Sequence, residues 1–239
     1  MKQKGEIKMK QNRSGMLVLC GAAFLLCSGC GTNKNPAADL LQYMENRYPE
    51  DDFTLDHYEL QSEQNTYQIT EIIITSAQFP DGEIHAKRWK TDKQWFYADN
   101  YMAFLLHDDI EACVHEIAER CFGECKVYMS SKWNSVVSSD FPTYANADYY
   151  LRSKPECGFA IYLPPDKLSM AEARERLELF KTELSNKEYD TIGVGVDIVA
   201  DADAYERICS YEGPNESTFN KKDLEFVGGF DHVKTAAQQ

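Results

Sequence analysis

Three polar residues at helical spacing have side chains that commonly bind metal ions. His107, Glu111 and His115 lie four residues apart, so on a helix they form a line along one edge. Two imidazoles and a carboxylate can bind an ion such as zinc. However, the two histidines would be about 12 Å apart along the helix axis, so only one of them could share an ion with Glu111. The spacing also differs from the HExxH sequence of zinc hydrolases.

These three residues also have a structural interpretation, which we favour. They lie beside a stripe of apolar residues, and the flank of such a stripe is typically polar and solvated. The sequence then predicts no metal site, no cofactor and no enzyme. A metal-dependent envelope enzyme or metal-binding module that uses His107, Glu111 and His115 remains the alternative.

Other short motifs lack the residues that their chemistry requires. Asp197, Asp201 and Asp203 suggest calcium, but an EF-hand loop also needs a glycine and a terminal glutamate in register. We predict instead that Asp201 or Asp203 caps a helix. Gly193 and Gly195 lie in a strand-like run and do not form the GxGxxG sequence of a dinucleotide site. No GxSxG sequence and no Ser–His–Asp or Cys–His arrangement can be identified.

Aromatic side chains gather in two places. The first group surrounds an expected hairpin and contains Trp89, Trp95, Phe96, Tyr97 and Tyr101. Exposed, these rings could stack on sugars of an envelope polysaccharide, but we favour burial because aromatic residues dominate cores. The second group lies in a polar stretch and contains Phe141, Tyr144, Tyr149 and Tyr150. Burial is harder there, so Tyr144, Tyr149 and Tyr150 are the better candidates for a recognition surface.

The periodicity of apolar residues predicts the elements of the first half. Asn35 and Pro36 begin a helix that Pro49 ends. Strands and a second helix follow, at residues 53–60, 67–75, 82–89, 95–97, 101–120 (the helix) and 126–129. The run from Ile72 to Ile74 is typical of a strand that is buried on both faces. Residues 91–93 are expected to close a hairpin.

The second half begins with residues 130–157, a polar, tyrosine-rich stretch that we interpret as a loop. The elements expected after it are a strand at 158–163, a helix from 169, a strand at 191–199, a short helix and a strand at 224–227. Ser169 and Glu172 predict a capping box at the start of the helix. Its apolar stripe consists of Met170, Ala173, Leu177, Phe180 and Leu184.

This order of elements predicts an α+β fold, with an antiparallel sheet packed against amphipathic helices. The elements could form two small α/β sandwich subdomains or one continuous sheet. The expected segments are a signal peptide (1–29), a tether (30–36), an α+β subdomain (37–130), a loop-rich connector (131–156) and a second α/β subdomain (157–239).

The N-terminal segment has the pattern of an export signal. Five basic residues against the single Glu6 give residues 1–14 a net charge of +4. The apolar run that follows, residues 16–27, has twelve residues. A stable membrane span needs roughly 20. A basic region, a short apolar run and small residues at a cleavage point are typical of a secretory signal peptide.

The end of the apolar run resembles the lipobox of bacterial lipoproteins. Ser28, Gly29 and Cys30 match its last three positions, whereas Cys27 stands where the family usually has leucine. The resemblance implies that Cys30 receives a diacylglyceryl group and becomes the N-terminus after cleavage. We therefore expect attachment to the extracytoplasmic face of the cell membrane through the lipid on Cys30.

The rest of the first half also resembles a group of known proteins, but more weakly. A short amphipathic helix, twisted strands and a helix opened by Asp99, Asn100 and Tyr101 resemble small uncharacterised lipoproteins of Firmicutes-type bacteria. The likeness covers residues 38–130 and implies no catalytic residue.

The charge of the chain limits the classes of molecule that can be its binding partner. The whole chain has 25 Lys and Arg and 39 Asp and Glu. Residues 1–29 contain five of these basic residues and one acidic residue, so the rest of the chain has 20 basic and 38 acidic residues, a formal charge of −18. Nucleic acid requires a basic face and is therefore excluded. We expect a non-catalytic binding or interaction module of the cell envelope, whose partner is a protein, a peptide or a glycan.

Five cysteines follow Cys30, namely Cys113, Cys121, Cys125, Cys157 and Cys209. Because five is an odd number, at least one thiol is free or pairs with another chain. We predict mostly unpaired thiols, with Cys121–Cys125 and Cys157–Cys209 as the pairs that are hardest to dismiss.

Overall fold

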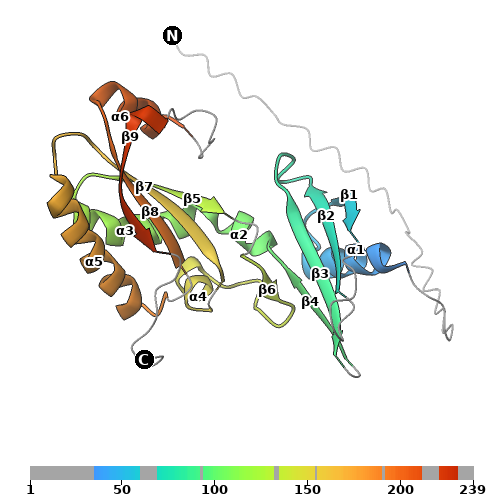
Figure 1. Ribbon diagram of the computed structural model, residues 1–239. Coiled ribbons are helices and arrows are strands. Elements are labelled where there is room, and N and C mark those ends of the chain that lie inside the picture. Colours follow the sequence, from blue (N-terminus) through green and yellow to red (C-terminus); the bar gives the residue numbers. More distant parts are fainter. Residues whose placement is uncertain are drawn as a thin grey trace, which may run out of the picture. The chain divides into compact units, whose positions relative to one another are not determined.

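The fold is known from a computed structural model, in which the described residues between Asn35 and Phe230 belong to one unit (Figure 1). The structure describes residues 35–59, 69–91, 94–131, 135–153, 155–189, 192–211 and 221–230. The expected signal peptide, residues 1–29, and Cys30 lie outside the described residues. Within those ranges, no helix combines the length and the apolarity that a bilayer span requires.

The first sheet is antiparallel throughout and has the strand order β1-β2-β3-β4-β6. Its strands are β1 (Phe53–Glu59), β2 (Ile69–Ser76), β3 (Ile84–Thr91), β4 (Gln94–Asp99) and β6 (Val137–Ser138). Helix α1 (Pro36–Arg47) packs against β1, β2 and β3, as Figure 1 shows. The sheet and α1 together hold the site described below.

Helix α1 begins as the sequence predicts. The Asn35 side chain accepts the backbone N–H of Ala37, and Pro36 occupies the first turn, where its missing N–H costs nothing. Leu40 and Met44 are fully buried one turn apart, so one stripe of the helix covers the sheet.

The prediction that the run from Ile72 to Ile74 is buried on both faces is wrong for one residue. Ile72 and Ile74 are fully buried in the core that contains α1, whereas Ile73 is half-buried. Successive strand residues point to opposite faces, and α1 covers only one of them. The β-branched run therefore indicated a strand correctly but overstated its burial.

The second sheet is mixed and has the order β5-β7-β8-β9. Its strands are β5 (Lys126–Ser131), β7 (Cys157–Leu163), β8 (Ile192–Val199) and β9 (Leu224–Phe230). Strands β7 and β8 are parallel and are joined by helix α5 (Met170–Asn186), while the other pairs are antiparallel. The two sheets with their packed helices confirm the α+β class.

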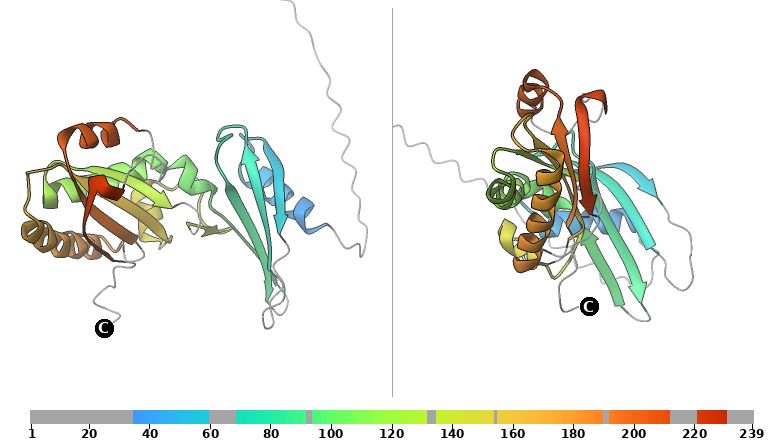
Figure 2. Two further views of the ribbon diagram at one scale, coloured as in Figure 1. Left: turned by 45° about the horizontal axis from the view of Figure 1, so that its top comes forward. Right: turned by 60° about the vertical axis from the view of Figure 1, so that its left-hand side comes forward.

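Helices cover both faces of the second sheet. Helix α3 (His107–Phe122) and α5 contact each other and lie on one face (Figure 2). Helix α6 (Ala202–Cys209) packs on β7 and β8 over a second, smaller core that includes Tyr128, Tyr162 and Val199. Asp201 caps α6 by accepting the N–H of Ala204, which confirms the capping prediction.

The helix expected at residues 101–120 is divided in two. Helix α2 (Tyr101–Leu105) ends before Leu106, whose backbone angles of φ −102° and ψ 9° leave the helical range, and α3 starts at His107. Gly123 ends α3 with φ +82°, a conformation that suits glycine. The apolar stripe of α3 is buried as expected, at Ile110, Val114, Ile117 and Cys121.

The polar stretch interpreted as a loop contains two elements, β6 and helix α4 (Ala147–Arg152). Asn146 caps α4 by accepting the N–H of Tyr149, and the Leu151 side chain is fully buried. One core cluster includes residues from Ala37 to Val227, on both sides of this stretch. The subdomain boundaries drawn from the sequence stay a prediction.

The cysteines that follow Cys30 are all free thiols. The prediction of mostly unpaired cysteines is therefore confirmed, and neither Cys121–Cys125 nor Cys157–Cys209 is a disulfide. Burial raises the pKa of the Cys125 and Cys157 thiols to about 12, which leaves both unreactive at neutral pH.

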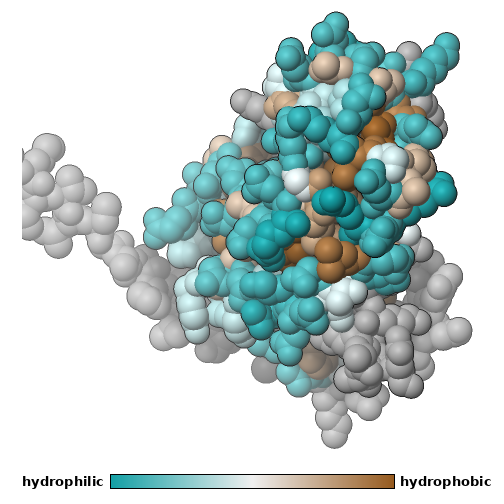
Figure 3. Space-filling model, turned by 90° about the vertical axis from the view of Figure 1, so that its left-hand side faces the viewer, coloured by the Kyte–Doolittle hydropathy of each residue, from teal (hydrophilic) through white to brown (hydrophobic). Residues whose placement is uncertain are grey.

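The outer surface is mainly polar. On the face shown in Figure 3, apolar residues appear as separate patches among hydrophilic ones. This distribution is ordinary for a folded domain in water, because polar residues cannot cover a whole surface.

Helix α5 provides a stability test with an internal control. Leu177 is 6% exposed, whereas Leu179 on the same helix is 50% exposed. We predict that Leu177→Ala lowers the free energy of unfolding by about 2–5 kcal/mol, the usual cost of emptying a core position. Leu179→Ala should change it by no more than about 0.5 kcal/mol. Urea unfolding of both variants checks this, and equal effects would show that the α5 stripe does not face the core.

Candidate functional site

The edge formed by His107, Glu111 and His115 lies on α3 and faces strand β5. Glu111 accepts the backbone N–H of Met129 at 2.7 Å, and His107 Nε2 lies 3.4 Å from Glu111 Oε1. His115 Nε2 lies 3.1 Å from the carbonyl oxygen of Cys125, just before β5. The interpretation of this edge as a solvated flank is therefore wrong, since Glu111 and His115 bind the backbone of the neighbouring strand region.

These contacts also bear on the metal alternative. The structure brings His107 and Glu111 together, while the Nε2 of His115 is directed at a carbonyl oxygen instead. Among the residues that the structure describes, no three His, Cys, Asp or Glu side chains are grouped so that they could hold a metal ion. Glu111 and His115 each contact the backbone at or just before β5, which is a structural role.

The tyrosines proposed for a recognition surface are divided between core and solvent. Tyr144 is 90% exposed and Tyr149 is 53% exposed, as that proposal requires. Tyr150 has no exposed surface and donates its hydroxyl to the carbonyl oxygen of Ser135 at 2.7 Å. The prediction is wrong for Tyr150, because α4 turns successive side chains about 100° apart and directs this one inward.

The hairpin aromatics are less buried than expected. Tyr101 is buried, but Trp89, Trp95, Phe96 and Tyr97 are only half-buried, so the prediction of burial is wrong for these four. Trp89 and Phe96 pair across β3 and β4 and stack with ring centroids 5.7 Å apart. Tyr97 belongs to the opposite face of the sheet, towards α1.

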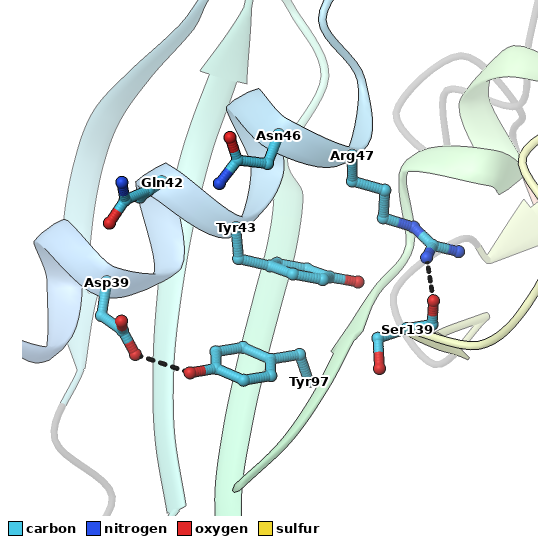
Figure 4. Close-up of a pocket in the computed structure, with 7 residues that line it drawn as sticks. All are labelled: Asp39, Gln42, Tyr43, Asn46, Arg47, Tyr97 and Ser139. Atoms are coloured by element: carbon cyan, nitrogen blue, oxygen red, sulfur yellow. Dashed lines mark hydrogen bonds between the residues drawn. The ribbon is translucent and has the colours of Figure 1, made fainter. Parts of the chain in front are cut away.

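A pocket of about 430 Å³ lies beside Tyr97, between α1, β4 and the residues after β6. Its lining, drawn in Figure 4, consists of Asp39, Gln42, Tyr43, Asn46, Arg47, Tyr97 and Ser139. The α1 residues recur every three or four positions, which places them along one side of the helix. This site is not among those predicted from the sequence, although the polar spacing on α1 was a signal for five of its seven residues.

Two stacked tyrosines form the middle of the pocket. The rings of Tyr43 and Tyr97 have centroids 5.0 Å apart and an interplanar angle of 23°. The Tyr97 hydroxyl donates to Asp39 Oδ2 at 2.8 Å, and Arg88 forms an ion pair with the same oxygen. The Arg88 guanidinium in turn lies 4.4 Å from the centroid of the Trp95 ring, a cation–π contact.

A fully buried carboxylate, Asp99, lies behind the pocket at the end of β4. It accepts the hydroxyls of Tyr43 at 2.6 Å and Tyr48 at 2.8 Å, and the backbone N–H of Tyr101 at 3.0 Å. Arg47 Nε lies 3.3 Å away as its counter-charge. An ionised carboxylate only accepts hydrogen bonds, so three donors and one counter-charge suit it.

Burial is the main influence on the ionisation of this group. Burial raises the pKa of Asp99, while the hydrogen bond from Tyr43 and the charge of Arg47 oppose the rise. Burial, together with the nearby charge of Asp99, also raises the pKa of Tyr43 and Tyr48 well above the ordinary value. Both hydroxyls therefore stay protonated and act as donors.

Arg47 connects this buried group to the residues after β6. Its guanidinium donates to the carbonyl oxygens of Ser139, of Phe141 at 2.6 Å and of Ser138 at 3.3 Å. Figure 4 shows the side chain extending from α1 to Ser139 across the end of the pocket. Arg47 thus provides the counter-charge of Asp99 and also hydrogen-bonds Ser139, which lines the pocket.

A second cavity, of about 570 Å³, lies at the ends of β7 and β8 beside the start of α5. Ser169 and Glu172 already satisfy each other there, because Glu172 accepts the backbone N–H and the hydroxyl of Ser169. Lys167 is exposed and lies 3.8 Å from Glu124. The α1 pocket, with its paired charges and stacked rings, is the more organised of the two.

The buried carboxylate gives a prediction for the site. Asp99→Asn should lower the free energy of unfolding by about 3–5 kcal/mol, because it leaves Arg47 without its counter-charge. Asp140→Asn, an exposed change in the adjoining segment, should have an effect within about 0.5 kcal/mol. Chemical unfolding measures both variants. A wild-type midpoint for Asp99→Asn would show that Asp99 does not support α1.

Comparisons with known proteins assign no family. No protein-family model matches the chain, and no curated protein matches it significantly. A crystal structure of a DUF5037 family protein from Ruminococcus gnavus ATCC 29149 is 10% identical, with a TM-score of 0.34, over 72% of this chain and 78% of that one. That score is too low to support an argument about fold or function.

Proposed function

We propose that the protein is a lipid-anchored lipoprotein of the cell envelope and that its folded part is a non-catalytic binding module. The ligand site of this module is the α1 pocket, the cavity lined by Asp39, Tyr43, Tyr97 and their neighbours. This pocket is the observation that carries the proposal, because it combines a concave shape, aromatic rings and oriented polar groups.

The anchor is supported by the N-terminal sequence. Ser28, Gly29 and Cys30 follow a short apolar run, and two acyl chains on Cys30 would hold the protein far better than one. Only four residues lie between Cys30 and Asn35, where the described fold begins. An extended residue spans at most about 3.6 Å, so the start of α1 would lie within roughly 20 Å of the lipidated residue.

A binding role, not catalysis, is supported by the state of the ionisable groups. A general base needs a pKa near the working pH and a free path to its substrate. Asp39 is paired with Arg88, Asp99 is fully buried, and burial raises the pKa of Tyr43 far above neutrality. Each of these groups is committed to an internal contact, which favours recognition over proton transfer.

The anchor is tested by changing the cysteine. Cys30→Ala should remove both fatty-acid incorporation and membrane attachment, because the thioether requires that thiol. Cys27→Ala and Cys20→Ala serve as controls and should keep both. Metabolic labelling with a radioactive fatty acid, followed by cell fractionation, measures the result. Label on the Cys30→Ala protein would exclude the proposed anchor.

The ligand site is tested by filling the pocket. Asn46 is exposed on α1, so Asn46→Arg should leave the fold intact while its long charged side chain occupies the cavity. The immobilised variant should retain at least about tenfold less isolated cell-envelope material than the wild type, a loss of roughly 1.4 kcal/mol. Asn186→Arg, an exposed change at the end of α5, is the control. Equal retention by all three proteins would exclude the pocket as the site.

A further inference from the structure

We infer that the α1 pocket binds a neutral, hydroxyl-rich ligand of the sugar class, held by the amides of Gln42 and Asn46. This inference rests on the proposed function, since it names the ligand class of the same pocket. Four features of the pocket carry it: its charge balance, its unused hydrogen-bonding groups, its aromatic wall and its size.

The charges that line the pocket are already balanced. Asp39 is paired with Arg88, and Arg47 is paired with Asp99. A charged ligand would have to compete with one of these pairs, and separating a buried pair leaves an uncompensated charge at high cost. A neutral ligand can enter without disturbing either pair.

The unused hydrogen-bonding groups are both donors and acceptors. The hydroxyls of Tyr43 and Tyr97 donate to aspartates, and Arg47 donates to backbone carbonyls. Gln42 and Asn46 are exposed, and their side-chain amides have no hydrogen bond to another residue that the structure describes. Each amide offers one acceptor and two donors, and residues four apart on a helix lie about 5–6 Å apart. Hydroxyl groups, which also donate and accept, complement such a pair.

Asp39 adds an acceptor between these amides and the sheet. Its contacts with Arg88 and Tyr97 both involve Oδ2. The second oxygen, Oδ1, is thus available to a ligand hydroxyl without loss of the ion pair. A carboxylate oxygen accepts a hydroxyl strongly, which favours a ligand rich in donors.

The aromatic wall and the volume fit a sugar. Figure 4 shows the stacked rings of Tyr43 and Tyr97 between the amide side chains and Arg47. Both rings are half-buried, so their exposed parts can contact the C–H groups of a sugar while the hydroxyls of that sugar meet the polar rim. The cavity of about 430 Å³ lies within the range of small-molecule sites, about 300–1,000 Å³.

The test is calorimetry on the full chain in a detergent without a sugar headgroup. The probes are maltotriose, cellotriose and the trisaccharide of N-acetylglucosamine, with trigalacturonate as the anionic comparison. We expect at least one neutral trisaccharide to bind, at least about tenfold more tightly than trigalacturonate. Absence of binding by all three at 10 mM (roughly the weak limit of specific recognition), or tighter binding of the anion, would overturn the inference.

Two substitutions locate the binding. Gln42→Ala and Asn46→Ala should each weaken the trisaccharide about fivefold, which corresponds to one net hydrogen bond of roughly 1 kcal/mol. Their melting temperatures should match the wild type because both side chains are exposed. Asn186→Ala is the matched control and should bind normally. Unchanged affinity in both pocket variants would overturn the inference.

The experiments can show that the sugar inference is wrong while the proposed function is right. If Asn46→Arg abolishes retention of envelope material while no neutral trisaccharide binds, the sugar inference is wrong and the pocket remains the site. If a trisaccharide binds and both alanine variants weaken it, the two proposals stand together.

Discussion

Asp99 is a charged group without exposed surface, and the arrangement of α1 on the first sheet depends on its compensation. An unpaired buried carboxylate would cost several kcal/mol, so its donors have to arrive from somewhere. Two donors, the hydroxyls of Tyr43 and Tyr48, belong to α1 and its C-cap, and the third is the N–H of Tyr101. The counter-charge, Arg47, also belongs to α1. The apolar contacts of Leu40 and Met44 bring α1 onto the sheet without favouring one orientation, and these directional bonds select it.

The α1 pocket is the outer side of the same network. Tyr43 donates to Asp99 and offers its ring to Tyr97, while Arg47 compensates Asp99 and holds the segment after β6. Because the charges satisfy one another, the cavity wall is polar yet neutral. The contacts that orient α1 therefore also form the wall of the pocket that we propose as the ligand site.

Helix α3 shows how a polar helix edge can resemble a metal motif. Glu111 binds the Met129 N–H, and His115 contacts the carbonyl oxygen of Cys125, just before β5. Strand groups at a sheet edge need such partners because a buried, unbonded N–H is unfavourable. Side chains of α3 thus provide hydrogen-bond partners for two backbone groups at or just before β5, the edge strand of the second sheet.

The sequence by itself determined the features that depend on neighbouring residues. The Asn35 and Asp201 caps, the Ser169–Glu172 box and the α5 stripe follow from interactions within a few positions, and all four are present. Alternation and β-branching also placed most strands. Their residues interact locally or through a fixed period, so the chain order alone carries the information.

Only the tertiary structure decided the burial of Tyr150 and the existence of the α1 pocket. Tyr43 meets Asp99 across 56 positions, and Arg47 meets Phe141 across 94, so no periodicity connects them. Tyr150 lies in a polar stretch whose composition suggests a loop, yet the core cluster extends to it and Ser135 satisfies its hydroxyl. Whether a polar side chain is exposed or buried depends on partners that folding brings from elsewhere in the chain.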